Sequence, residues 1–129
     1  MKKKTLLALA AAAALCAAWG GYYYRFGMEA PEVIRKLSGL RMAVALYKLE
    51  HKGLPGAFED TVKEGALEAA PALKLPRHAG SSGVRGASSF EIKDTGAWAY
   101  VNNRQDPDFG LVFIDCSHKD EKGRYWSEF

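Results

Sequence analysis

The side chains in this sequence with the strongest metal and nucleophile chemistry are three histidines and two cysteines. His51, His78 and His118 lie in three separate segments, and no pair of them has the i, i+4 spacing of a zinc-binding helix. Neither Cys16 nor Cys116 belongs to a Cys-x-x-Cys pair. The spacing therefore predicts no zinc site, and two cysteines are too few for a disulfide framework.

Cys116 and His118 lie two residues apart, a spacing that could pair a thiol nucleophile with its base. The apolar residues around them predict a strand over 111–117, on which residues two apart share a face without forming a supported pair. No third side chain is evident that would orient the histidine. We therefore interpret Cys116 as a half-buried strand residue and His118 as a solvent-facing turn residue, and we predict no catalytic residue and no enzyme activity.

Asp106 and Asp108 have the best case for a bound ion. They flank Pro107 in a loop that also holds Asn102 and Asn103. Calcium prefers clustered carboxylate, amide and backbone oxygens, although these residues are also common turn formers. The loop lacks the glycine-spaced pattern of an EF-hand. The sequence thus requires no cofactor, and calcium at Asp106 and Asp108 is the one metal site that it suggests.

A long amphipathic helix is expected to follow residue 28. Pro31 suits a first helical turn, and apolar residues then recur at steps of three and four. A Gly-Leu-Pro-Gly run at 53–56 ends the pattern, so the helix spans about 20 residues. The residues expected on its buried face are Val33, Ile34, Leu37, Leu40, Ala43, Val44 and Tyr47.

The second half of the chain changes to a strand pattern. Residues 57–68 allow only short helical turns, and the small polar residues of 79–89 predict an exposed loop. Alternating runs at 90–93 and 98–101 flank turn residues and predict a hairpin. With strands at 111–117 and 124–129, the expected fold class is α+β, a long helix packed on a small C-terminal antiparallel sheet.

The first 27 residues have the layout of a secretory signal or a signal anchor. Lys2, Lys3 and Lys4 precede an uncharged apolar run, and they keep the N terminus in the cytoplasm. The aromatic group beside Arg25 resembles an interfacial belt, which favours an uncleaved anchor over a cleaved signal peptide. The residues expected to form this membrane segment are Leu6, Leu7, Leu9, Leu15, Trp19, Tyr22, Tyr23 and Tyr24.

Composition limits what lies beyond this segment. The chain has 129 residues, enough for one small domain. Its formal charge of +3 comes from 18 basic against 15 acidic residues, and the three N-terminal lysines account for the whole excess. The rest of the chain is neutral and shows no basic stripe, so nucleic acid is not an expected partner.

Three stretches resemble type IV pilin-like proteins, and most closely the major pseudopilin of type II secretion. The first is the helix end from Leu40 to Pro55, with its Leu-Tyr pair and Gly-x-Pro. The others are Phe58-Glu-Asp-Thr-Val, and Gly96-Ala-Trp-Ala-Tyr-Val-Asn-Asn with Asp106-Pro-Asp-Phe-Gly-Leu-Val-Phe-Ile-Asp115. The resemblance covers residues 33–129. The family's prepilin cleavage signature is missing, because the apolar segment starts directly after Lys4 and carries no acidic residue.

The resemblance implies a single-pass protein of the bacterial inner membrane. Residues 1–27 would be the signal anchor or signal peptide, and residues 28–129 a pilin-like domain in the periplasm or outside the cell. Implied partners are the membrane, other pilin-like or secretion-system subunits and further copies of the chain. Some such proteins bind calcium in the loops of the sheet, a role that would fall on Asp106 and Asp108. The implied function is a structural or accessory subunit of a type II secretion or type IV pilus-like assembly.

A second class of function stays open. If the leader is cleaved, the remainder would be a soluble periplasmic binding or adaptor domain. Its contact surface would use Trp98, Tyr100, Tyr125 or Trp126, although large aromatics on strands beside an amphipathic helix more often fill a core.

Overall fold

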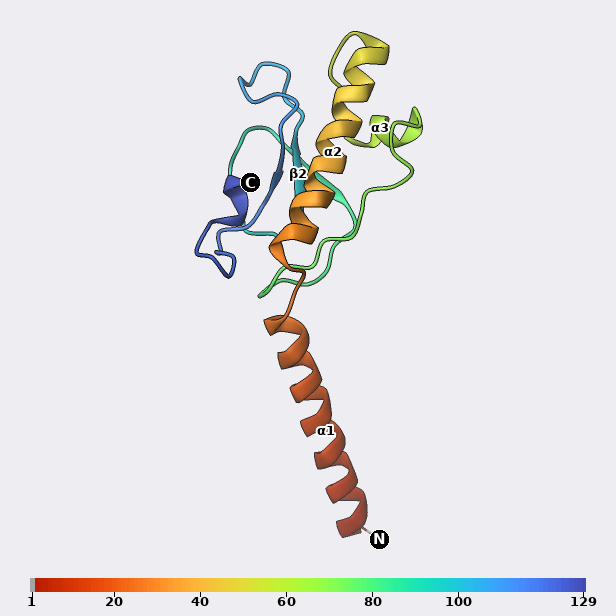
Figure 1. The fold of residues 1–129 in the computed structure, drawn as a ribbon. Coiled ribbons are helices and arrows are strands. Elements are labelled where there is room, and N and C mark those ends of the chain that lie inside the picture. The colour runs from red at the N-terminus through yellow and green to blue at the C-terminus, as the bar shows by residue number, and fades with distance from the viewer. Residues whose placement is uncertain (1) are drawn as a thin grey trace.

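The computed structural model describes residues 2–129 and has two parts, a projecting helix and a small head (Figure 1). Helix α1 spans Lys2–Arg25 and stands away from the head, which begins with helix α2 at Ala30–His51. A non-helical link at 26–29 separates the two helices. The α+β fold class is confirmed, with a long apolar helix at the N terminus and a small sheet after it.

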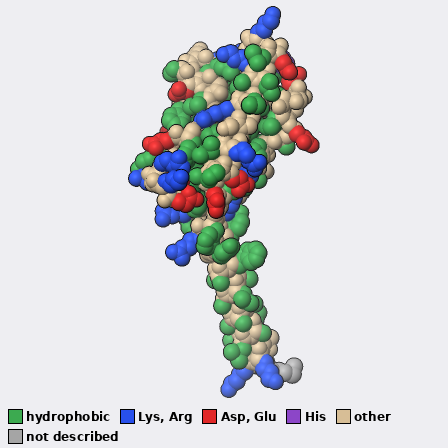
Figure 2. Space-filling model, in the orientation of Figure 1, with side chains coloured by type: hydrophobic (Ala, Val, Ile, Leu, Met, Phe, Trp, Pro, Cys, Tyr) green, Lys and Arg blue, Asp and Glu red, His purple; other side chains and the backbone are tan. Residues whose placement is uncertain are grey.

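Helix α1 is built from alanine and leucine, which favour helix, and none of its residues is buried. Leu15 is 72% exposed and Trp19 is 76% exposed. The space-filling view shows apolar side chains along the projecting helix and lysines at its tip (Figure 2). By length and composition α1 could cross a membrane or act as a signal sequence.

Helix α2 packs one face on the sheet. Pro31 lies in its first turn, and Lys52 ends it in a left-handed conformation with φ of 57°. The predicted apolar stripe is confirmed, with Ile34 and Tyr47 half-buried at its edges. The buried residues of the helix are Ala30, Val33, Leu37, Leu40, Ala43 and Val44.

The sheet has three strands in the order β1 (Val84–Ala87), β2 (Trp98–Val101) and β3 (Val112–Ile114). Strands β1 and β2 are parallel, with Val84 opposite Trp98, and β2 and β3 are antiparallel, with Trp98 opposite Ile114. The sheet is therefore mixed, and the prediction of a purely antiparallel sheet is wrong.

The predicted strand at 90–93 is also wrong, and β1 lies instead in the segment expected to be a loop. The backbone N–H groups of Lys93 and Asp94 donate to the Asp115 carboxylate at 2.6 and 3.1 Å, so they are not available to a strand ladder. The Phe90 ring packs edge-on against Phe113, with centroids 4.8 Å apart. This segment therefore covers the sheet and does not extend it.

The C-terminal strand expected at 124–129 is replaced by a short 3-10 helix, η1, at Trp126–Glu128. An isolated bridge between Lys119 and Tyr125 is the pairing found next to it. Trp126 is buried in the main core, and its backbone N–H donates to the His118 carbonyl at 3.1 Å. Burial of Trp126 therefore determines the path of the last residues, and strand pairing does not.

Strand alternation divides the core into two layers. Trp98, Tyr100 and Ile114 belong to the larger cluster, which includes the buried face of α2. Ala99 and Phe113 point to the opposite face, where Ile92 and Leu111 pack on a smaller cluster. Helix α2 therefore covers one face of the sheet, and the irregular segment after β1 helps to cover the other.

Two buried aromatics hold the chain between α2 and β1, a stretch that includes the short helix α3 (Glu59–Lys63). The Tyr100 hydroxyl donates to the Pro55 carbonyl at 2.6 Å, and the Trp98 indole N–H donates to the Pro71 carbonyl at 2.8 Å. Burial raises the pKa of Tyr100 to about 12. These two hydrogen bonds attach the irregular chain at Pro55 and Pro71 to the central strand, β2.

Replacing Leu40 by alanine tests the packing of α2. Leu40 is fully buried, so Leu40→Ala should lower the free energy of unfolding by about 2–5 kcal/mol. Leu49→Ala is the matched control, because Leu49 lies on the same helix and is 78% exposed; its effect should stay within about 0.5 kcal/mol. Urea unfolding in detergent, followed by the near-UV circular dichroism of Trp98 and Trp126, measures both. Equal losses would contradict this packing.

Candidate functional site

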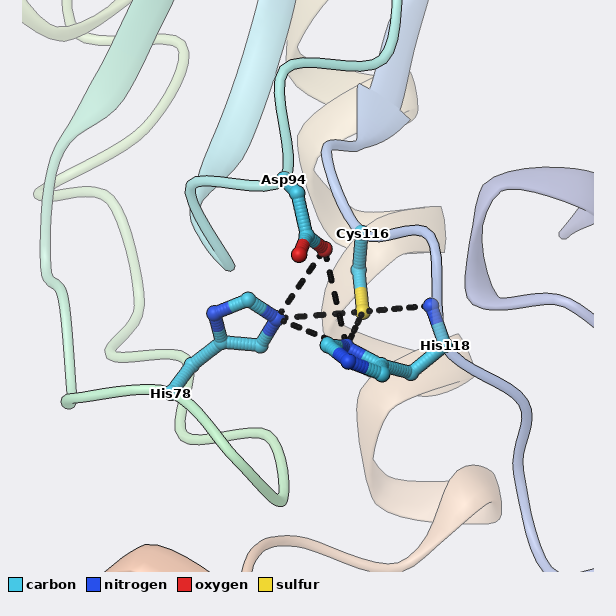
Figure 3. Close-up of side chains that lie close together, drawn as sticks. All are labelled: His78, Asp94, Cys116 and His118. Carbon is cyan, nitrogen blue, oxygen red and sulfur yellow. Dashed lines mark hydrogen bonds and ion pairs between the residues drawn. The ribbon is translucent and has the colours of Figure 1, made fainter.

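Four side chains with metal-ligating atoms converge at one end of the sheet: His78, Asp94, Cys116 and His118, here called the four-residue cluster (Figure 3). His78 precedes β1, Asp94 lies between β1 and β2, and the other two follow β3. Since β1 and β2 are parallel and β3 runs the other way, the starts of the first two strands and the end of the third lie together. The topology thus gathers three segments that are distant in sequence.

Five of the six separations between the donor atoms of the cluster are nearly equal. His78 Nε2 is 3.2 Å from His118 Nδ1 and 3.3 Å from the Cys116 sulfur, which is 3.5 Å from His118 Nδ1. Asp94 Oδ1 is 3.4 Å from His78 Nε2 and 3.5 Å from His118 Nδ1. All four donor atoms fall within 4.8 Å of one another, so they surround a common point.

Backbone hydrogen bonds fix the orientation of two members. The N–H of Ser117 donates to Asp94 Oδ1 at 2.8 Å, and the N–H of His118 donates to the Cys116 sulfur at 3.3 Å. The N–H of Cys116 itself donates to the Ile114 carbonyl at 3.0 Å, so the chain turns directly after β3. This turn brings the side chains of Cys116 and His118 into contact.

Gly96 makes room for the His78 ring. It is buried with φ of +71°, a conformation that favours glycine. A Cβ atom at this position would lie 2.3 Å from Cγ of His78, well inside contact distance. The ring therefore packs against bare backbone, which fixes its position beside Asp94.

Burial differs across the cluster. Cys116 is fully buried, whereas the side chains of Asp94 and His118 are 39% and 28% exposed. Burial lowers the pKa of His78. For Asp94, burial acts to raise the pKa, but hydrogen bonds from Ser117 and the nearby histidines leave it below its usual value. The cluster thus combines neutral imidazole with an ionised carboxylate, both forms that bind cations.

The thiol of Cys116 is not a free nucleophile. Burial raises its pKa to about 11, and the carboxylates of Asp94 and Asp115 add to this effect. A reactive cysteine needs a lowered pKa and access to solvent, and this residue has neither. The chemistry that the arrangement offers is ligation of a cation by sulfur, nitrogen and oxygen together.

Asp115 positions the segment that carries Asp94. Its carboxylate, which is fully buried, accepts hydrogen bonds from the Thr95 hydroxyl at 2.5 Å and from Arg85 at 3.0 Å, in addition to the backbone N–H groups described above. Burial acts to raise the pKa of Asp115, but the hydrogen bonds from Thr95 and Lys93 and the charge of Arg85 lower it below its ordinary value. The turn at 93–95 is therefore held by one carboxylate.

The structure corrects the interpretation of Cys116 and His118. The cysteine is fully buried, not half-buried, and its side chain meets that of His118. The prediction was wrong because it extended the strand to residue 117, whereas β3 ends at Ile114. His51, the third histidine, lies apart at the end of α2, where it stacks on Tyr47.

The predicted calcium residues lie outside this cluster. Asp106 is half-buried and its carboxylate accepts the backbone N–H of Asp108 at 2.8 Å, a local turn contact. Asp108 is exposed. Calcium binding at this pair stays a prediction.

The sequence held one signal for the four-residue cluster, the Cys-x-His spacing at 116–118. Nothing in the sequence links this pair to His78 or Asp94, which lie in two other segments. Their convergence depends on the parallel pairing of β1 with β2, which the sequence pattern did not predict.

Comparison with known proteins identifies no similar protein. No protein-family model matches the chain, and no curated protein or solved structure shows significant similarity to it.

Asp115→Asn tests the support under the site. Asparagine keeps the shape of the side chain but has no charge, and its NH2 group directs two donor hydrogens toward backbone N–H groups. Asp115→Asn should therefore lower the free energy of unfolding by about 3 kcal/mol. Asp106→Asn, the same chemical change in a surface turn, should alter stability by less than about 0.5 kcal/mol. Urea unfolding of the two variants beside the parent chain measures this difference, and equal stability would show that Asp115 does not hold the 93–95 turn.

Proposed function

We propose that this protein is a membrane-anchored structural or accessory subunit of a type II secretion or type IV pilus-like assembly. The N terminus lies in the cytoplasm, α1 crosses the inner membrane once, and the head lies in the periplasm or outside the cell. The head acts by packing and by contact with partner subunits, so the proposal assigns it no catalytic step.

The observation that carries the proposal is the exposed apolar helix α1. It has 24 residues and none is buried, and its most apolar 18-residue window has a mean hydropathy of 1.6. A helix of this length measures about 36 Å, enough for a hydrocarbon core of about 30 Å. Lysines at one end and Tyr22, Tyr23 and Tyr24 at the other match the two interfaces of a bilayer. Lipid, or neighbouring apolar helices, would cover side chains that the head leaves exposed.

The joint between α1 and the head also supports a role as one mechanical unit. The backbone N–H of Arg77 donates to the Tyr24 carbonyl at 2.6 Å, and that of Met28 donates to the Lys74 carbonyl at 2.7 Å. Gly27 packs so closely on Pro76 that a Cβ atom would lie 2.6 Å from it. These contacts oppose free swivelling of the head on its anchor, as a subunit of an ordered assembly requires.

The soluble-adaptor alternative depends on aromatic side chains at the surface. Trp98, Tyr100 and Trp126 are at most 2% exposed, so they belong to the core. Of the four aromatics considered, Tyr125 is the one that reaches solvent, at 42% exposure. The burial of the other three favours the anchored subunit over an aromatic binding surface.

The anchor is tested by the mature N terminus. Intact mass of a C-terminally tagged chain from separated membrane and soluble fractions should show the uncut protein in the membrane. Leu9→Lys, a charge in the apolar stretch of α1 that costs about 3 kcal/mol in a bilayer centre, should shift protein out of the membrane fraction. Leu49→Lys, at an exposed site on α2, should not. A chain cut near residue 19 and found in the soluble fraction would favour the adaptor alternative.

Lateral packing of α1 is tested by its own cysteine. Cys16 is exposed on α1 and Cys116 is buried, so mild oxidation in native membranes should join only helices that pack side by side. We expect a disulfide-linked dimer, or a mixed product with a partner subunit, that disappears in Cys16→Ser. The double variant Cys16→Ser/Ala14→Cys moves the thiol to another face of α1. If oxidation leaves both the parent chain and this variant as monomers, the result contradicts assembly through α1.

A further inference from the structure

The four-residue cluster has the arrangement of a metal site, and the sequence and the proposed function leave it without a role. We propose that His78, Asp94, Cys116 and His118 bind one zinc ion, and that this ion fastens three loops of the head together. The inference rests on the geometry of the head and stands independently of the proposed function.

The spacing of the donor atoms matches a tetrahedral zinc ion. Ligand bonds of about 2.0–2.3 Å at tetrahedral angles place neighbouring ligand atoms about 3.3–3.6 Å apart. Five of the six separations between the donor atoms run from 3.2 to 3.5 Å and include nitrogen–nitrogen, nitrogen–sulfur and nitrogen–oxygen pairs. The sixth, between the Cys116 sulfur and the Asp94 carboxylate, lies within 4.8 Å. Figure 3 shows the four side chains directed toward one another, with the dashed contacts joining them in pairs.

Hydrogen bonding alone accounts poorly for this arrangement. Each imidazole nitrogen carries at most one hydrogen, the thiol carries one, and an ionised carboxylate carries none. At most three hydrogens therefore serve five close contacts, and the His78 and His118 nitrogens, 3.2 Å apart, cannot both hold theirs toward each other. A cation satisfies all four lone pairs at once.

The donor set selects zinc over calcium. Thiolate and imidazole are ligands for zinc and its neighbours among the transition metals, whereas calcium takes oxygen alone. One thiolate and one carboxylate supply two negative charges, which balance a divalent cation beside two neutral imidazoles. Four protein ligands complete a tetrahedron, the pattern of a structural site and not of a catalytic one.

The surroundings supply what a metal site needs around its ligands. The N–H groups of His118 and Ser117 donate to the sulfur and to the carboxylate, as outer-shell partners do. His118 lines an open hollow whose wall also includes Tyr24 and Arg77, so an ion can reach the cluster from solvent. Gly96 keeps the His78 ring in place from the other side.

The ion would also steady the joint with the anchor. His78 belongs to the same segment as Arg77 and Gly80, whose backbone N–H groups donate to Tyr24 and Tyr23 at the end of α1. Lys74 of this segment bonds to the link that follows α1. Tying His78 to the chain after β3 therefore holds this segment against the head. Loss of the ion should make the three loops more mobile and weaken the contacts between the His78 segment and the end of α1.

Cobalt titration of the full chain in detergent tests metal binding. We expect one Co²⁺ per chain, with the intense visible bands of tetrahedral cobalt and a near-ultraviolet thiolate-to-metal band, both lost when one equivalent of Zn²⁺ is added. A spectrum that stays that of hydrated cobalt would overturn the proposal.

Variants with matched controls assign the ligands. Cys116→Ser should remove the thiolate band, and His78→Gln should keep it while lowering the affinity more than about 100-fold. Cys16→Ser and His51→Gln replace the other cysteine and the other histidine, and both should bind as the parent chain does. A thiolate band that survives Cys116→Ser, or that Cys16→Ser abolishes, would overturn the assignment.

The unaltered chain gives a test that does not depend on a variant folding. A strong chelator should lower its melting temperature, and added Zn²⁺ should restore it, with one bound zinc in the native mass. A chain purified without metal that neither binds Zn²⁺ nor changes its melting temperature with it would overturn the proposal.

Discussion

The packing of α2 on the face of β2 and β3 is the constraint on which the head depends. Leu37 and Leu40 meet Trp98 and Ile114 in one buried cluster, and this contact fixes the helix relative to the sheet. The strands are only three or four residues long, so most of the head is irregular chain that no ladder holds. A core of this size contributes little free energy for ordering loops, and small folds of this kind use additional stabilising interactions.

Buried polar groups supply these additional interactions in the head. The Asp115 carboxylate accepts the backbone N–H groups of 93–95 and the Arg85 guanidinium. The Asp120 carboxylate accepts the backbone N–H groups of Lys122 and Arg124 and the Arg124 guanidinium. Each carboxylate closes a turn whose N–H groups would otherwise lack partners. Asp94 of the four-residue cluster belongs to the first turn, Cys116 and His118 lie just before the second, and His78 brings in a third segment. The irregular half of the head is therefore organised from a few side chains at one end of the sheet.

The same end of the sheet contacts the end of helix α1. Tyr23 and Tyr24 at the end of α1 bond to the segment that carries His78, and Lys74 lies over the Tyr23 ring at 4.6 Å. Helix α1 is therefore held to the head in two ways, through the chain link at 26–29 and through this segment. Helix α1, the loops around the cluster and the core are thus connected through direct contacts.

The sequence by itself determined the helices, because periodicity and composition act locally: the apolar run of α1, the stripe of α2 and the Gly-Pro stop after it are written in adjacent residues. It also placed Trp98 and Tyr100 on one face of a strand. Only the tertiary structure decided the partner of that strand, because Asp115, some 20 residues away, takes the N–H groups of the segment expected to pair with it. With β1 in that place, His78 and Asp94 came to lie beside Cys116 and His118, a meeting set by chain topology that no local pattern records.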